Sequence, residues 1–259
     1  GRLLPSQTLR LPEGAIEARP LLAPVVPGEP GAVLDRLEQR LVGALLALAE
    51  RGPLALGLTA GKDSRLVVAA AHAAGVEAFA YTYAWDGIRR PDRELPPRLA
   101  RSIGMEHRVI EPRPRDPARL ELWDAQTDRH SIEYDREFFA RGQLDRLAGA
   151  GCDIGGSLFD VPVAAWYQEF PSPELPPTPE ETAALVVDEM PSAVPEGIEA
   201  WARWMFDHPE PAMDWRDRFA LEQRVAGWIG SICTGLDLAP TPALHVANCR
   251  AYLADTVAL

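Results

Sequence analysis

The chain has 259 residues, of which 47% are apolar, and its formal net charge is −12 at pH 7. A chain of this length can bury a substantial core, as one large domain or two small ones. The negative charge argues against a surface that neutralises nucleic-acid phosphates, and no apolar run reaches the roughly 18 residues of a membrane span. We therefore expect a globular, cytoplasmic protein that binds neither nucleic acid nor a membrane.

Residues 1–30 are rich in proline and have no sustained hydrophobic period. The segment 3–14 predicts either a short hairpin, with Pro12-Glu13-Gly14 as its turn, or an extended linker. Apolar residues then recur at spacings of three and four over 31–51, which predicts an amphipathic helix.

The stretch 54–68 predicts a strand, a tight turn and the start of a helix. The apolar run 54–58 has strand length, Thr59-Ala60-Gly61 is a small-residue turn, and Asp63-Ser64 opens an apolar helical run. Such a junction directs backbone N–H groups and the positive end of a helix dipole at one point, which suits an anion with several oxygens. The alternative is that Asp63 or Ser64 merely caps an ordinary helix.

Strands and helices alternate along the following residues, which predicts a parallel, doubly wound sheet in an α/β fold with a helical C-terminal part. Because loops after neighbouring parallel strands converge, 155–160 should face 59–63. We expect an N-terminal segment at 1–30, an α/β core at 31–165 and a helical part at 166–259. The remaining expected elements are a strand at 76–83, a helix from Asp92 with Pro96 and Pro97 in its first turn, a strand at 106–110, one or two helices at 117–149, a strand from 151, and helices at 178–190, 196–206, 215–232 and after 247.

The turn at 59–64 resembles the pyrophosphate-binding loop of the ATP pyrophosphatase, or PP-loop, superfamily, which usually reads Ser-Gly-Gly-x-Asp-Ser. Gly61, Asp63 and Ser64 match this pattern, whereas Thr59 and Ala60 replace its first two residues. Lys62 within the loop is the only lysine among 26 basic residues, which favours a role for its compact ammonium group.

Further along, the chain resembles the asparagine synthetase branch of that superfamily. An Asp-initiated helix leads into Ala100, Gly104 and His107 at the spacing A-x-x-x-G-x-x-H, and Asn248 and Arg250 stand at the spacing Asn-x-Arg near the end. The branch carries Gly-Glu-Gly-x-Asp-Glu where this chain has 155–160. Here the Glu is absent, and Asp160 fits with an offset of one residue.

The resemblance implies an adenine nucleotide alpha hydrolase-like fold that uses ATP and Mg²⁺ to adenylate a small-molecule or peptide carboxylate, releases pyrophosphate, and passes the acyl group to an amine donor. It also allows a partner protein or a homo-oligomer. Residues 1–30 would be the remnant of a glutaminase-like domain, and without a cysteine before Cys152 we expect no glutamine hydrolysis. The residues implied are Leu58, Thr59, Ala60, Gly61, Lys62, Asp63, Ser64, Tyr81, Thr82, Gly155 and Gly156 for the nucleotide, Asp63 and Asp160 for magnesium, and Lys62, Asp63 and Arg224 for catalysis.

Two alternatives from other functional classes stay open. One is a tRNA-modifying PP-loop enzyme, against which the acidic charge and the lack of paired cysteines count. The other is a nucleotide-binding or scaffold protein that has lost catalysis, which Ala60 and the altered 155–160 loop favour.

Overall fold

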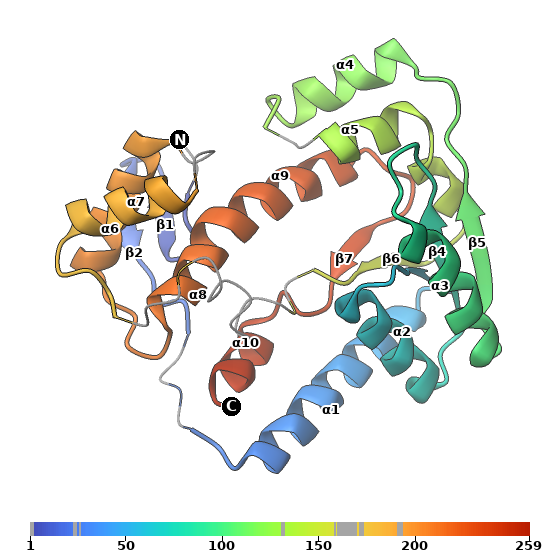
Figure 1. Cartoon of the computed structure of the whole chain (residues 1–259), viewed down its shortest axis with the longest axis horizontal. Helices are drawn as coiled ribbons and strands as arrows, with labels where there is room; N and C mark the ends of the chain where they lie inside the picture. The colour runs from blue at the N-terminus through green and yellow to red at the C-terminus, as the bar shows by residue number, and fades with distance from the viewer. Residues whose placement is uncertain are drawn as a thin grey trace.

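The computed structural model describes residues 3–22, 25, 27–130, 133–157, 159, 170, 174–190 and 194–259. Its centre is a parallel five-stranded sheet in the order β5-β4-β3-β6-β7 (Figure 1). The predicted doubly wound α/β fold with a helical C-terminal part is confirmed. The strands are β3 (Leu54–Gly57), β4 (Ala78–Tyr83), β5 (Glu106–Ile110), β6 (Cys152–Gly155) and β7 (Ala243–His245).

The strand order creates a switch point between β3 and β6. The chain enters the sheet at β3, moves outward through β4 and β5, and then returns to β6 on the other side of β3. Leu54 of β3 is in register with both Ala78 of β4 and Cys152 of β6, so these three strands are level. In open parallel sheets the crevice for a ligand lies at the carboxyl ends of the strands that flank such a switch point.

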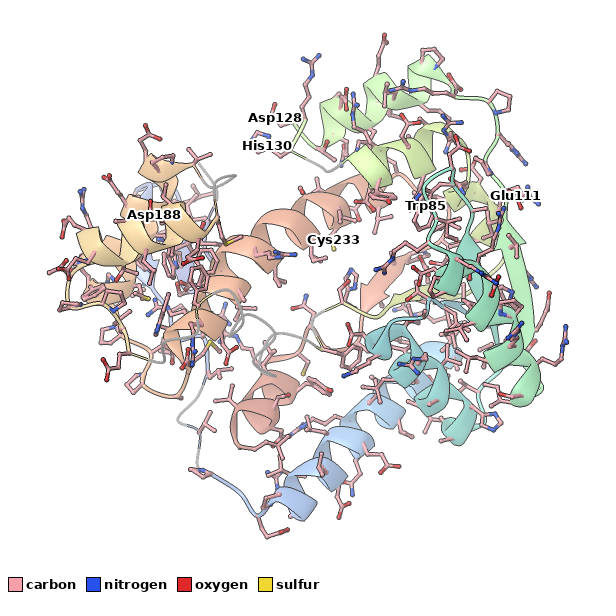
Figure 2. All side chains as sticks on the ribbon, in the orientation of Figure 1. Trp85, Glu111, Asp128, His130, Asp188 and Cys233 are labelled. Atoms are coloured by element: carbon pink, nitrogen blue, oxygen red, sulfur yellow. The ribbon has the colours of Figure 1, made fainter. Side chains whose placement is uncertain are left out.

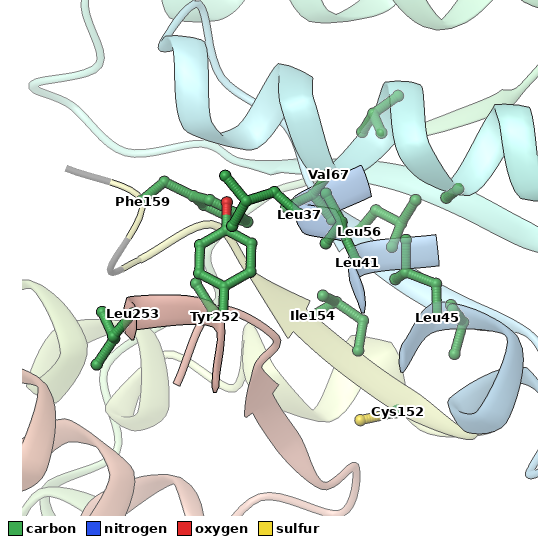
Figure 3. Packing of buried hydrophobic residues seen from close by; sticks show 14 of the residues in the cluster. Leu37, Leu41, Leu45, Leu56, Val67, Cys152, Ile154, Phe159, Tyr252 and Leu253 are labelled. Carbon is green, nitrogen blue, oxygen red and sulfur yellow. The ribbon is translucent and has the colours of Figure 1, made fainter. Parts of the chain in front are cut away.

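One face of the sheet is covered by α1 (Pro30–Ala49), α2 (Lys62–Ala74), α3 (Arg90–Ser102) and α10 (Arg250–Val257). The leucine stripe of α1 packs against β3 and β6, and Phe159 and Tyr252 close the cluster near the carboxyl ends of these strands (Figure 3). The helix predicted at 31–51 is thus confirmed. Its apolar face belongs to the main core.

The other face is covered by α4 (Pro117–Gln126), α5 (Glu133–Ala140), the short 3₁₀ turn η1 (Leu144–Leu147) and α9 (Ala226–Leu236). The prediction of one or two helices over 117–149 is confirmed as two α-helices, to which η1 adds a short 3₁₀ turn. Asp128, Arg129 and Gly142 have positive φ values of 49°, 59° and 63°, which a right-handed helix does not accommodate.

The helix α3 begins at Arg90 rather than at Asp92, so Pro96 and Pro97 lie in its interior and not in its first turn. Neither proline can donate to the carbonyl four residues earlier, which leaves two backbone acceptors of the helix without their usual donors. The N-terminal segment does form the hairpin that was one of its two predicted forms, with β1 (Gln7–Arg10) antiparallel to β2 (Ala15–Ala18).

A second hydrophobic cluster lies away from the sheet (Figure 1). It joins Leu4 and Phe170 to the helices α6 (Pro179–Glu189), α7 (Pro195–Asp207) and α8 (Trp215–Phe219). The predicted helix 215–232 is a continuous run from α8 through the π-helical segment η2 (Ala220–Val225) into α9, which reaches back to the sheet. No helix among the described residues is long and apolar enough to cross a membrane.

Candidate functional site

The turn between β3 and α2 is held by its own hydroxyl groups. The backbone N–H of Thr59 donates to Ser64 Oγ at 3.0 Å, and that of Gly61 donates to Thr59 Oγ1 at 3.0 Å. The two hydroxyl oxygens are themselves 3.0 Å apart. Thr59 and Ser64 therefore shape the loop, and either hydroxyl would have to exchange an internal bond for one to a ligand.

A carboxylate from α3 completes the loop. Asp92 is 6% exposed, and its Oδ1 accepts the backbone N–H of Ala60 at 2.8 Å while its Oδ2 accepts Arg89 Nε at 3.2 Å. The Ala60 N–H, which the sequence assigned to a nucleotide, therefore already donates to a protein carboxylate. The sequence marked Asp92 only as the start of a helix, so its contact with the loop was missed.

The helix α2 still presents an anion-binding end. Gly61 is its N-cap, so the first-turn N–H groups of Lys62, Asp63 and Ser64 have no acceptor inside the helix. The positive end of the helix dipole lies at the same point. Lys62 is exposed and Asp63 half-buried in the first turn of this helix, so a cation and a carboxylate stand at its N-terminal end.

The loop after β6 meets this helix end, as the convergence of parallel strands requires. A side chain at Gly156 would place its Cβ 3.0 Å from the backbone N of Ser64 and 3.1 Å from the carbonyl carbon of Asp63. Only glycine allows this approach without displacing backbone atoms. The structure thus brings Gly156 to Asp63 and Ser64, across the switch point.

Two further predicted residues stand apart from this group. Arg224 is exposed on η2 and lines neither of the cavities at the carboxyl ends of β3, β4 and β6. Asp160, the second predicted magnesium ligand, lies outside the described residues. Within the described residues, no three His, Cys, Asp or Glu side chains are grouped so that they could hold a metal ion. Burial is the main cause that raises the pKa of Tyr252, and the nearby Asp63 carboxylate adds to it.

A cavity of about 300 Å³ opens beside the loop, at the carboxyl ends of β3 and β4. Four of the predicted nucleotide-binding residues line it. The Thr82 hydroxyl donates to Leu58 O at 2.8 Å, and this hydrogen bond joins β4 to the residue that follows β3. His107 Nε2 lies 3.0 Å from the same hydroxyl, and burial lowers the pKa of this histidine. The lining residues are Gly57, Leu58, Thr59, Tyr81, Thr82, Tyr83, Trp85, Asp92, Tyr134, Asp135 and Phe138.

The aromatic wall of this cavity was not predicted. Trp85 lies in the loop after β4 (Figure 2). It contacts Tyr134 of α5 edge to face, with ring centroids 5.1 Å apart, and the Phe138 and Tyr83 rings have centroids 4.7 Å apart. The sequence predicted only that one or two helices lie at 117–149, and it did not bring Tyr134 or Phe138 to the site. Their approach to the crevice depends on how α5 lies over the sheet.

No protein-family model matches this chain, and no curated protein matches it. Its function is therefore inferred from the chemistry of the crevice and from the sequence motifs.

Proposed function

We propose that the chain is an ATP-dependent, AMP-forming ligase that joins a carboxylate to an amine. The observation that carries this proposal is the position of the cavity of about 300 Å³, which shares Thr59 with the turn before α2. The cavity offers apolar surface to a flat ring, and the adjoining N-terminus of α2 offers backbone N–H groups to a polyanion. Adenine and the phosphates of one ATP molecule have this combination.

The walls of the cavity suit adenine. Leu58 is fully buried beneath it, and the rings of Tyr83, Trp85 and Phe138 offer flat apolar surface. Its volume lies near the lower limit of roughly 300 to 1,000 Å³ for small-molecule sites. A base is smaller than a whole drug-sized ligand, so the phosphates would extend outside this cavity toward α2.

The end of α2 suits the departing pyrophosphate. A carboxylate oxygen attacks the α-phosphorus, the bond from that phosphorus to the bridging oxygen of the β-phosphate breaks, and pyrophosphate leaves with the electron pair. Negative charge builds on the leaving group, and the N–H donors of the first turn of α2 and the Lys62 ammonium group would stabilise it. Mg²⁺ takes carboxylate and phosphate oxygens, and Asp63 is the described carboxylate at this point.

The second half of the reaction uses the mixed anhydride. The amine nitrogen attacks the acyl carbon, the bond from that carbon to the AMP oxygen breaks, and an amide, AMP and one proton are released. No Gly-x-x-x-x-Gly-Lys-[Ser/Thr] loop is present in the chain to hold a γ-phosphate for transfer. The expected products of ATP are therefore AMP and pyrophosphate rather than ADP and phosphate.

The first test is calorimetric titration with ATP and Mg²⁺. We expect Asp63→Ala and Lys62→Ala each to weaken binding by about tenfold or more, because a charged contact of this kind contributes on the order of 1.5 to 3 kcal/mol. Arg101→Ala, which removes an exposed cation at the far end of α3, should bind like the wild type. Binding that is unchanged in both loop variants would contradict the proposal.

A second test separates an active ligase from a protein that only binds nucleotide. Wild type and Asp63→Ala are incubated with ATP, Mg²⁺ and a panel of carboxylates, and exchange of labelled pyrophosphate into ATP is measured. Exchange with at least one carboxylate, lost in Asp63→Ala, is the expected result. ATP binding without exchange on any carboxylate would favour the nucleotide-binding alternative.

A further inference from the structure

A row of polar side chains crosses the sheet on the face that α9 covers. Tyr81 Oη on β4 donates to Asp153 Oδ1 on β6 at 2.8 Å, although β3 lies between the two strands. Gly57 makes room for this contact, since a Cβ at that position would lie 3.4 Å from Tyr81 Oη. On the next strand, His245 is paired in register with Gly155, and its ring fills the space where a side chain at 155 would stand.

These groups are buried, and several lack partners. Asp153 is 9% and Tyr81 6% exposed. Both ring nitrogens of His245 and the hydroxyl of Tyr83 are buried and make no hydrogen bond of normal geometry in the part of the chain that the structure describes, although Tyr83 lies close to the Tyr81 hydroxyl and His245 close to the Gly155 backbone. An unpaired buried polar group costs about 1 to 3 kcal/mol, so three such atoms around one space indicate that something else binds there.

The space is a cavity of about 200 Å³ between the sheet and α9. Its polar side is formed by Tyr81, Tyr83, Asp153 and His245, and its apolar side by Ile229, Ile232 and Leu236 of α9. It shares Tyr81, Tyr83, Asp135 and Phe138 with the cavity beside the turn before α2, so the two cavities are neighbours on either side of these side chains.

We propose that this second cavity binds a primary alkylammonium group, and that it is the site of the amine donor. The site itself stands on the geometry above, whereas the role of its ligand as the donor rests on the proposed function. The cavity offers the carboxylate of Asp153, a ring nitrogen of His245 and the Tyr83 hydroxyl oxygen as acceptors. Among the described residues that line it there is no lysine or arginine to repel a cation, and the isoleucines suit an alkyl chain.

The protonation states of His245 and Asp153 are compatible with a cationic ligand. Burial lowers the pKa of His245, which leaves its ring uncharged at neutral pH and able to accept a hydrogen bond. Burial raises the pKa of Asp153 to about 7, although the hydrogen bond from Tyr81 acts in the opposite direction. The other titratable groups that face Asp153 are Tyr81 and Tyr83 from β4, Asp135 from α5 and the neighbouring Cys152, while α9 presents apolar residues.

In the reaction, an ammonium group must lose a proton before its nitrogen can attack an acyl carbon. An Asp153 carboxylate within hydrogen-bond distance of the cation can take that proton, which leaves a neutral amine and a protonated Asp153. The amine would then stand next to the nucleotide site, and only the side chains that line both cavities would have to move for it to meet the acyl group.

The test measures binding of n-butylammonium to the whole chain by calorimetry, without nucleotide, and compares it with n-butanol and butyrate at pH 8. We expect the cation to bind and the other two to bind at least about tenfold more weakly, because only the cation pairs with a carboxylate. Asp153→Asn should weaken binding of n-butylammonium by about tenfold or more. Asp188→Asn, on α6 and away from the sheet, is the matched control and should bind like the wild type (Figure 2).

A second measurement does not depend on a variant. In the wild type, affinity for n-butylammonium should rise as the pH increases through about 7, where Asp153 ionises while the ligand keeps its charge. Equal binding of the three probes, pH-independent binding, or no binding of the cation at millimolar concentrations would overturn the inference. Because no nucleotide is present, failure here leaves the ATP titration unaffected, and failure of the ATP titration leaves this site in place.

Discussion

At the scale of one residue, Asp153 should make the free energy of unfolding depend on pH. Its ordinary pKa of 3.8 is raised to about 7 in the fold, so between these pH values the folded protein holds a proton that the unfolded chain has lost. The free energy of unfolding must then fall as pH rises across this window, by up to about 4 kcal/mol for this group. We predict that Asp153→Asn, which cannot ionise and keeps an acceptor for Tyr81, is more stable than the wild type at pH 8 and equally stable at pH 4. Urea denaturation at both pH values measures this, and an equal difference at both would contradict it.

Asp92 is the second residue whose role the structure identifies. Asp92→Ala leaves the Ala60 N–H without its acceptor and releases Arg89. We predict a loss of about 1 to 3 kcal/mol in unfolding free energy and weaker ATP binding, because the turn that precedes α2 is no longer held. Asp35→Ala, at an exposed position on α1, is the control. Thermal unfolding with and without ATP distinguishes the two effects, and unchanged values in both would show that the carboxylate does not hold the loop.

At the scale of elements, the contact between the β6 loop and the first turn of α2 determines the geometry of the crevice. We predict that Gly156→Ala destabilises the protein by about 1 to 3 kcal/mol and weakens ATP binding, because the new methyl group meets backbone atoms that cannot rotate away. Gly197→Ala is the matched control. It lies in α7 with nothing within 4 Å of the added Cβ, and should be stabilising by about 0.5 to 1 kcal/mol. Equal stabilities for the two variants, measured by thermal unfolding, would contradict the contact.

At the scale of the whole molecule, a buried polar network joins the N-terminal hairpin to the helices α7 and α8 and the segment η2. Glu222 is fully buried and accepts from Ser6 Oγ, from Trp201 Nε1 at 2.9 Å and from Arg218 Nε at 3.1 Å, while Trp204 Nε1 donates to Ser6 Oγ at 3.0 Å. The N-terminal hairpin is therefore anchored to the helices that follow residue 195, and α9 continues from this network to the sheet.

This network predicts a large effect of distant substitutions. Glu222→Ala should lower the free energy of unfolding by about 3 to 5 kcal/mol, because it leaves the buried Arg218 without its carboxylate partner. Ser6→Ala should lower the free energy of unfolding by about 1 to 3 kcal/mol, because Trp204 Nε1 and one oxygen of Glu222 lose a hydrogen-bond partner. Ser102→Ala, at an exposed position at the end of α3, should have little effect. Tryptophan fluorescence during urea unfolding measures all three, and a Ser6→Ala variant with wild-type stability would show that the hairpin is not anchored through this contact.

Local patterns in the sequence determined most of the sheet. The β3 strand, the small-residue turn and the N-terminus of α2 depend on residues within a few positions of one another, so periodicity and helix-start signals were sufficient to predict them. The alternation of strands and helices then indicated the doubly wound class, and with it the convergence of Gly156 on Asp63 and Ser64. The strand β7 was missed because its three residues, Ala243–His245, are too few to show a period.

Contacts between distant residues were decided only by the tertiary structure. Asp92 meets Ala60 from 32 residues away, and Tyr81 meets Asp153 from 72 residues away. Neither pair has a sequence signal, because the register between strands and the tilt of a helix over a sheet are set by packing of the whole core. The turn between β3 and α2 could therefore be predicted from the chain alone, whereas the aromatic wall and the polar row beside it could be found only once the strands were placed side by side.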